Sequence, residues 1–83
     1  MRNFTAQLLM SNIRNQSSHL LRMHNMRVTL PRLQIVEYFM RYSRAVSYSE
    51  IESEFSALID RVTVYRTLKS FTENGLIHAI PDE

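Results

Sequence analysis

Apolar residues recur at helical spacing along most of the chain, and residues that interrupt helices are scarce. The sequence contains only one glycine and two prolines, so the pattern predicts helices joined by short turns. The first segment, residues 3–15, fits either an amphipathic helix or a frayed arm. A second short helix is predicted to begin at a cap formed by Ser17 or Ser18.

Two further helices have sharper start signals. Thr29 can cap a helix that carries Pro31 in its first turn, where the missing N–H costs little. Ser47 stands three residues before Glu50, which is the pattern of a capping box. The positions expected to point inward are Leu33, Ile35, Val36, Phe39 and Met40 in the first of these helices and Ile51, Phe55 and Leu58 in the second. The glutamates expected to form a solvated face of the second helix are Glu50, Glu52 and Glu54.

The last helix is predicted to run from a cap at Asp60 to Gly75, which stands where a helix ends in a left-handed residue. Its inward positions are predicted to be Val64, Leu68 and Phe71. Residues 76–80 then form a short predicted strand that Pro81 stops. A strand needs a partner, and the chain ends three residues later. We therefore expect a β-hairpin cut through, in preference to a strand that pairs elsewhere.

These elements predict a mainly α fold of the winged helix-turn-helix class, with three to five helices and a short, truncated β-wing. Residues 1–16 are assigned to an N-terminal extension and residues 17–83 to the winged-helix domain. Many domains of three helices share this outline without binding DNA, so the outline alone does not decide the function.

Composition narrows the class of protein. A chain of 83 residues that is 45% apolar makes one small domain with a thin core. It contains no cysteine, which excludes disulfides, thiolate metal sites and a cysteine nucleophile. No apolar run reaches the roughly 20 residues of a membrane span, so we expect a cytoplasmic protein without membrane contact. An organellar transit peptide is the alternative for the arginine-rich start, which has no acidic residue before Glu37.

Charge is divided unevenly along the chain. Residues 1–46 contain seven arginines against one acid, and residues 47–83 contain three basic residues against seven acids. Nine of the ten basic residues are arginine, whose guanidinium suits bidentate contact with phosphate or guanine. This distribution indicates a nucleic-acid partner, with ordinary surface charge as the alternative.

Four segments of this sequence resemble the N-terminal domain of the ferric uptake regulator family of bacterial metal-dependent repressors. The segments are R-V-T-L-P-R at residues 27–32, V-S-Y-S-E at 46–50, T-V-Y-R-T-L at 63–68 and G-L-I at 75–77. The resemblance implies a dimeric, nucleoid-associated repressor of transcription that binds an AT-rich palindrome in double-stranded DNA. It also implies that the parent protein is loaded with Fe²⁺, Zn²⁺ or another divalent metal. Residues 1–16 match no motif of the family.

The candidate DNA-binding residues are Arg27, Arg61, Thr63, Tyr65, Arg66 and Lys69. At about 100° per residue, the basic residues and Tyr65 of the last helix fall opposite its apolar stripe. Tyr65 offers a ring for a thymine methyl and a hydroxyl for phosphate, and Arg61 lies in the first turn, where such helices reach base edges. Thr63 either bonds a phosphate or supports the turn, and we favour phosphate. The alternatives are a packing role for Tyr65 and a solvated surface charge for Lys69.

By resemblance, Tyr65 touches bases, Arg66 contacts backbone or base, and Arg27 lies near phosphate or the minor groove.

The sequence predicts no complete metal site and no catalytic site. His19 and His24 are five positions apart and do not share a helix face, and His78 stands alone on the predicted strand. The resemblance implies one ligand before the third helix, where residues 44–46 are R-A-V, and an acidic ligand at the place of Glu83. The other ligands of the family lie in a C-terminal dimerisation and metal domain that these residues do not include. Glu83 is thus an orphaned ligand, no cofactor is expected here, and no constellation suggests an enzyme.

The leading hypothesis is therefore sequence-specific binding of double-stranded DNA as the DNA-reading domain of a metal-dependent repressor. The alternative is a winged-helix module for protein contact, whose N-terminal apolar residues dock a partner helix. A third possibility is that residues 1–16 replace the missing dimerisation domain. The apolar residues concerned are Phe4, Leu8, Leu9 and Ile13.

Overall fold

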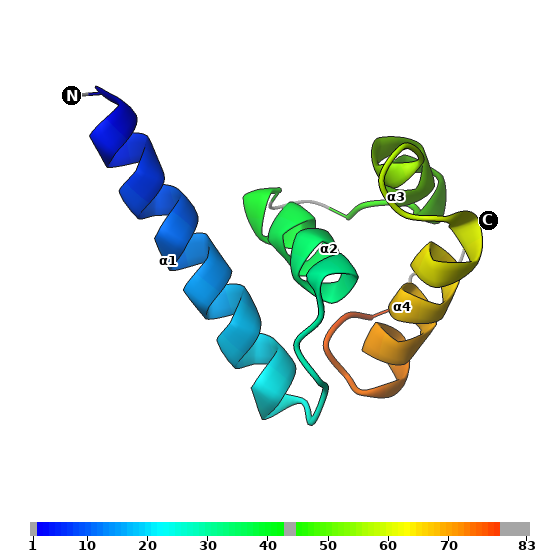
Figure 1. Cartoon of the computed structure of the whole chain (residues 1–83). Helices are drawn as coiled ribbons and strands as arrows, with labels where there is room; N and C mark the ends of the chain where they lie inside the picture. Colours follow the sequence, from blue (N-terminus) through cyan, green and yellow to red (C-terminus); the bar gives the residue numbers. More distant parts are fainter. Residues whose placement is uncertain (1, 43–44, 79–83) are drawn as a thin grey trace. The chain divides into compact units, whose positions relative to one another are not determined.

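The computed structural model describes the backbone of residues 2–42 and 45–78 and the side chains of residues 12–42 and 45–78 (Figure 1). The helices of this part are α1 (Arg2–Met23), α2 (Leu30–Arg41), α3 (Tyr48–Phe55) and α4 (Arg61–Glu73). They belong to two compact units, unit 1 (Met1–Ala45) and unit 2 (Val46–Glu83), which are described separately. The mainly helical class is confirmed. No helix of the described residues is long and apolar enough to cross a membrane.

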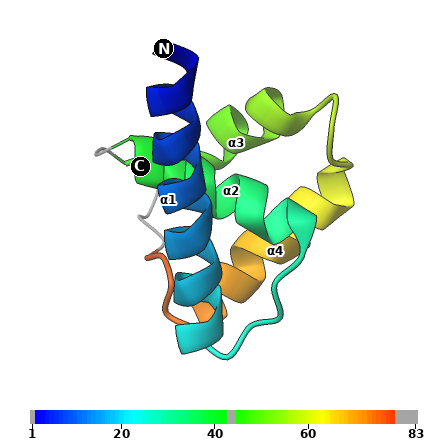
Figure 2. The same ribbon diagram turned by 60° about the vertical axis from the view of Figure 1, so that its left-hand side comes forward.

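Helix α1 of unit 1 is continuous, so the predicted start of a second helix at Ser17 or Ser18 is wrong. It crosses α2, and its first turns extend beyond the end of that helix (Figures 1 and 2). Ser17 is fully buried, and its hydroxyl donates to the sulfur of Met40 at 3.3 Å. A serine can sit inside a helix when its hydroxyl finds a partner there, because it then no longer competes for the backbone. The division of the chain at residue 16 stays a prediction.

Helix α1 ends at a left-handed residue that the sequence reading missed. Asn25 has φ +60°, and asparagine tolerates this conformation better than other residues with side chains. The N–H of Met26 donates to the carbonyl of Leu21 at 2.9 Å, and that of Asn25 donates to the carbonyl of Arg22 at 3.0 Å. These two bonds form a Schellman motif, which satisfies carbonyls at the end of the helix. Leu21 and Met26 are both buried, as the apolar contact of this motif requires.

Helix α2 begins as predicted, since the Thr29 side chain accepts from the N–H of Arg32 at 3.4 Å and proline occupies the first turn. Its inward face differs from the prediction at Met40, which is 37% exposed. Glu37 is buried instead, because Arg14 of α1 forms an ion pair with it. A buried carboxylate is tolerated only when it is paired, and this partner lies 23 residues away. Among the residues of unit 1 whose side chains are described, the buried apolar ones are Leu21, Met26, Leu33, Ile35, Val36 and Tyr38.

The start of helix α3 of unit 2 confirms the predicted capping box. The N–H of Glu50 donates to the Ser47 hydroxyl at 3.0 Å, and the N–H of Ser47 donates to the Glu50 carboxylate at 3.1 Å. The predicted inward position of Leu58 is wrong, because this residue is 71% exposed and Ile59 is buried. The helix ends at Phe55, so its periodicity does not extend to residues 58 and 59.

Helix α4 begins at the predicted Asp60 cap and ends at Glu73, and Gly75 follows the C-cap Asn74 with φ +79°. A second Schellman motif closes it, since the N–H of Leu76 donates to the carbonyl of Phe71 at 2.9 Å. Val64 and Phe71 are buried as predicted, whereas Leu68 is only half-buried and its neighbour Thr67 is buried. Residues 76–78 are not in a strand, and the rest of the predicted strand, Ala79 and Ile80, lies outside the described residues. Within residues 46–78 of unit 2, the buried apolar side chains are those of Ile51, Phe55, Ile59, Val64 and Phe71.

Candidate nucleic-acid interface

The start of α4 is held by one carboxylate. The Asp60 side chain accepts the N–H of Thr63 at 3.1 Å and the Thr63 hydroxyl at 2.6 Å. These two bonds stabilise the ionised form, the hydroxyl bond most, and they hold the pKa of Asp60 below its ordinary value. The Thr63 hydroxyl hydrogen is therefore committed to Asp60. This geometry favours support of the turn, the alternative role of Thr63, while a contact with phosphate stays a prediction.

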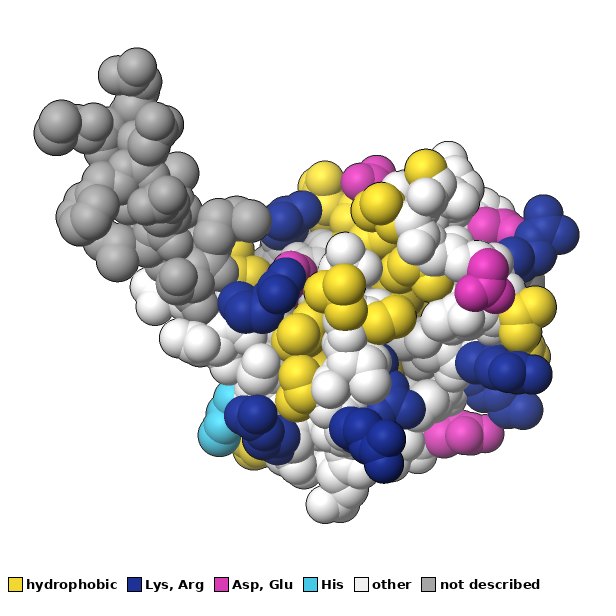
Figure 3. All heavy atoms as spheres, viewed as in Figure 1, with side chains coloured by type: hydrophobic (Ala, Val, Ile, Leu, Met, Phe, Trp, Pro, Cys, Tyr) yellow, Lys and Arg dark blue, Asp and Glu magenta, His cyan; other side chains and the backbone are white. Residues whose placement is uncertain are grey.

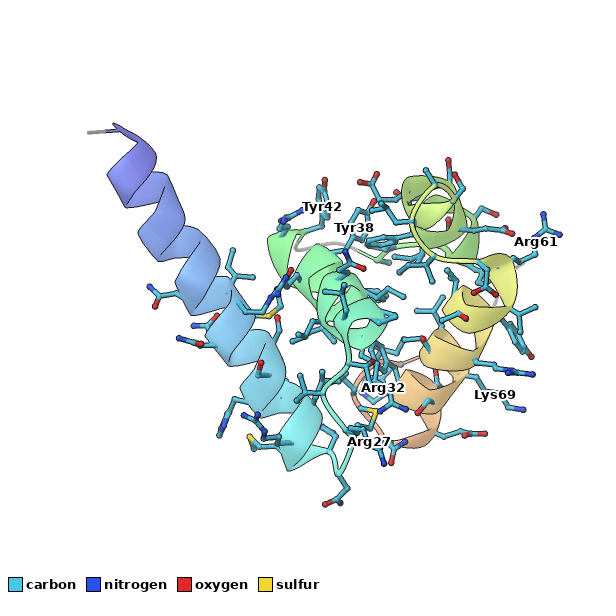
Figure 4. All side chains as sticks on the ribbon, viewed as in Figure 1. Arg27, Arg32, Tyr38, Tyr42, Arg61 and Lys69 are labelled. Carbon is cyan, nitrogen blue, oxygen red and sulfur yellow. The ribbon has the colours of Figure 1, made fainter. Side chains whose placement is uncertain are left out.

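The exposed face of α4 carries the remaining candidates. Tyr65 is 55% exposed, and the Arg61 side chain is 80% exposed. Arg66 and Lys69 are also exposed, and Arg61 and Lys69 project from the helix into solvent (Figure 4). Along this edge, basic side chains lie beside hydrophobic and acidic ones (Figure 3). The outward orientation inferred from the helical period is thus the one observed.

Val62 belongs to the same face and was missed by the sequence reading. It is 51% exposed, and it precedes Tyr65, Arg66 and Lys69 by three, four and seven residues, the spacing of one helix face. Its spacing from Tyr65, Arg66 and Lys69 was a signal already available in the sequence. Its two methyl groups add an apolar contact surface between the basic side chains.

Two side chains of α3 contact this face. Glu52, whose side chain is 28% exposed, forms an ion pair with Nε of Arg61. The ring of Tyr48 meets that of Tyr65 edge to face, with centroids 6.3 Å apart and planes at 80°. The predicted solvated face of three glutamates is therefore wrong for Glu52, and Glu50 belongs to the capping box. These contacts join helices that follow each other, yet no sequence pattern singles them out.

Arg27 lies in unit 1, between α1 and α2. Its side chain is exposed, and its carbonyl accepts from Nη1 of Arg32 at 2.7 Å (Figure 4). The bond fixes the backbone beside Arg27 and leaves the Arg27 guanidinium outside this contact. The candidates thus fall into a group on α4 and one residue in unit 1.

The described residues contain no group of three or more histidine, aspartate or glutamate side chains that could hold a metal ion. Nδ1 of His24 donates to the carbonyl of Leu20 at 2.8 Å, at the end of α1. Glu83, the candidate ligand, lies outside the described residues. The donor set of the described residues does not fit the divalent metal that the resemblance implies.

The last helix of unit 2 thus presents tyrosine, arginine and lysine side chains to solvent. The sequence profile of the Ferric uptake regulator family matches residues 23–82, which is most of the chain. The protein therefore belongs to the ferric uptake regulator family, whose members are metal-dependent, DNA-binding regulators of transcription rather than enzymes. No curated protein and no solved structure gave a match. Most of α1 lies before the matched residues.

Proposed function

We propose that this chain reads double-stranded DNA through the exposed face of α4, as the DNA-reading part of a metal-dependent repressor. The observation that carries the proposal is the set of side chains on that face, defined here as the reading face. Its members are Arg61, Val62, Tyr65, Arg66 and Lys69. A helix fits the major groove of B-DNA, where each base pair presents a distinct pattern of donors, acceptors and methyl groups.

Each member of the reading face has a distinct chemical use. The guanidinium of Arg61, in the first turn of α4, suits the O6 and N7 atoms of guanine, and Arg66 suits guanine or phosphate. Val62 and the ring of Tyr65 supply apolar contact for thymine methyl groups, which accords with an AT-rich target. Lys69, two turns further along, contacts phosphate as a point charge. Thr63 and Asp60 fix the backbone from which these side chains project.

Electrostatics limits the number of phosphates that this chain neutralises. Unit 2 carries seven acidic against three basic residues, so α4 alone provides little long-range attraction. Arg27 of unit 1 adds a fourth basic candidate, for phosphate or the minor groove. If Arg27, Arg66 and Lys69 contact phosphates while Arg61 contacts guanine, the slope of log K against log salt is about −2.7, at about −0.9 for each phosphate neutralised.

The experiment is selection of bound duplexes from a randomised DNA library, followed by a salt titration on the selected duplex. Replacement of Tyr65 or Arg61 by Ala should cost about 1–3 kcal/mol of binding free energy and relax the selected sequence. Arg22→Ala, which removes an exposed arginine of α1, is the matched control and should preserve the selected sequence. Equal selection by the parent, Tyr65→Ala and Arg61→Ala would show that α4 does not read bases.

Family membership supports the remaining parts of the proposal. We infer a bacterial cytoplasmic repressor that acts as a dimer on an AT-rich palindrome, with Fe²⁺, Zn²⁺ or another divalent metal as its signal. Two identical half-sites, one or more helical turns apart, are what a two-fold dimer requires. A selected sequence with no inverted repeat would argue against the dimer. Failure to bind any duplex at low salt would favour the module for protein contact.

A further inference from the structure

Two residues of α3 and two residues of α4 form a matched pair of contacts. Tyr48 and Glu52 are four positions apart on α3, and Arg61 and Tyr65 are four positions apart on α4. Residues at this spacing share one face of a helix. The facing side chains meet one to one, since Glu52 forms an ion pair with Arg61 and Tyr48 packs edge to face on Tyr65. Each contact therefore ends on a member of the reading face.

We propose that Tyr48 and Glu52 are positioning residues for DNA recognition, which hold Tyr65 and Arg61 in the orientations used to read bases. The inference rests on the proposed function and assigns to α3 a part in specificity. Neither residue needs to touch DNA for this role. Its physical basis is preorganisation, because ordering a surface arginine or tyrosine at the moment of binding opposes association.

Glu52 is suited to orient Arg61 without occupying the whole guanidinium. The carboxylate pairs with Nε of Arg61, whereas bidentate contact with a guanine can be made by the two Nη groups. The Glu52 side chain is 28% exposed and that of Arg61 is 80% exposed. Glu52 is therefore the less mobile partner and is suited to fix the position of Arg61. Glu54 of the same helix is exposed and makes no such pair, which makes it a matched control.

Tyr48 is suited to orient the ring of Tyr65. It is the first residue of α3 and directly follows the Ser47 cap, whose two hydrogen bonds fix the local backbone. An edge-to-face contact at 6.3 Å lies within the range that aromatic pairs prefer. With one side of the Tyr65 ring held in this way and 55% of the residue still exposed, the ring keeps a surface for a thymine methyl.

The specificity ratio is the affinity for the selected DNA divided by the affinity for scrambled DNA. It distinguishes a positioning role of Glu52 from an effect of its negative charge alone. Removing the carboxylate of Glu52 or Glu54 reduces repulsion of phosphates, which strengthens binding to every duplex. Phosphates are common to all duplexes, so this effect cancels in the ratio of affinities for selected and scrambled DNA. A loss of orientation at Arg61 lowers that ratio, because only base contacts carry sequence information.

The first test compares Glu52→Gln with Glu54→Gln in the whole chain, on one selected and one scrambled duplex at fixed salt. We expect Glu52→Gln to lower the specificity ratio about fivefold, within the range of one impaired base contact, and Glu54→Gln to leave it unchanged. Glu52→Gln should have no further effect in an Arg61→Ala background. An equal ratio for both glutamine variants, or the same loss without Arg61, would overturn the inference for Glu52.

The second test concerns the ring of Tyr48. Tyr48→Leu should lower the specificity ratio and blur the selected sequence at the thymine positions, whereas Tyr48→Phe keeps the ring and should bind as the parent does. Far-UV circular dichroism verifies that both variants fold. A loss in Tyr48→Phe equal to that in Tyr48→Leu would point to direct contact by the hydroxyl and overturn the positioning role. The positioning role would also be overturned if Tyr48→Leu lowered the specificity ratio as much in a Tyr65→Ala background as it does in the parent.

These measurements distinguish a failure of the proposed function from a failure of the positioning role of Tyr48 and Glu52. If the parent chain selects no sequence, both the proposed function and this inference fail. If the parent selects a sequence, Tyr65→Ala and Arg61→Ala relax it, and the α3 variants match their controls, the proposed function stands and this inference alone is wrong.

Discussion

The ion pair between Arg14 and Glu37 holds α1 on α2, and its removal should destabilise unit 1. The Glu37 side chain is 8% exposed, whereas that of Arg14 is 47% exposed. Arg14 donates from both Nε and Nη2, the second bond at 3.2 Å to Oε1 of Glu37. The hydrogen bond to Glu37 raises the pKa of Arg14 above its ordinary value. The chosen change is Arg14→Met, which keeps the length of the side chain and removes the charge.

The magnitude follows from the unequal exposure of the two partners. Loss of one partner of a fully buried pair costs about 3–5 kcal/mol, and an exposed pair contributes about 0–1 kcal/mol. Glu37 is nearly buried, but water reaches the place of Arg14 once the guanidinium is gone. We therefore expect a loss of about 2 kcal/mol, between the two limits. For a chain of this size, that corresponds to a fall in Tm of about 8–16 °C.

The assay is thermal and urea unfolding followed by far-UV circular dichroism. Arg22→Met is the control, because Arg22 is an exposed arginine of the same helix. Its loss should cost less than about 1 kcal/mol, from the favourable position of a cation near the end of α1. The double variant Arg14→Met/Glu37→Met should be more stable than Arg14→Met, since it leaves no unpaired carboxylate.

Equal stability of Arg14→Met and Arg22→Met would refute this reasoning. It would mean that solvent satisfies Glu37 without Arg14, and that apolar contacts alone hold α1 against α2.

Two further predictions concern the ends of α4. Because its folded pKa is lowered, Asp60 stabilises the fold above its ordinary pKa, and this contribution disappears as pH falls through the folded value. Asp60→Asn keeps a side-chain oxygen that can accept the cap hydrogen bond, but this side chain does not titrate. The Tm of the variant should therefore fall less than that of the parent when the pH is lowered. Identical dependence of Tm on pH in the two proteins would contradict the prediction. Gly75→Ala adds a Cβ atom at φ +79°, where no other atom lies within contact distance, so the only penalty is backbone strain. The free energy of unfolding should therefore fall by about 1 kcal/mol. Gly75→Asn should lower the free energy of unfolding less than Gly75→Ala does. An unchanged free energy of unfolding in Gly75→Ala would contradict the left-handed conformation of this residue.

Local signals were the part of the fold that could be predicted from the sequence. The caps at Thr29, Ser47 and Asp60 and the left-handed glycine at residue 75 depend on side chains within a few positions of the backbone they satisfy. The helical period also placed Tyr65 on the exposed face of α4. Each of these predictions needs only one helix and its ends.

Contacts between elements were the part that could not be predicted. Burial of Glu37 depends on Arg14 of another helix. Arg61 and Tyr65 likewise contact Glu52 and Tyr48 of α3. Leu58 was wrongly predicted to be buried because the helical spacing of apolar residues continues in the sequence after helix α3 has ended. Asn25 was missed because asparagine marks a left-handed helix end less clearly than glycine does.

The central claim, that α4 reads bases through Tyr65, is tested most directly by replacing thymine with uracil in the selected duplex. The change removes only the C5 methyl group, one position at a time. The parent should lose about 0.8 kcal/mol, the contribution of one buried carbon group, at the thymine that Tyr65 contacts. Tyr65→Ala should bind the thymine and uracil duplexes equally at that position. The same dependence on thymine in Tyr65→Ala and in the parent, at every position, would contradict the account.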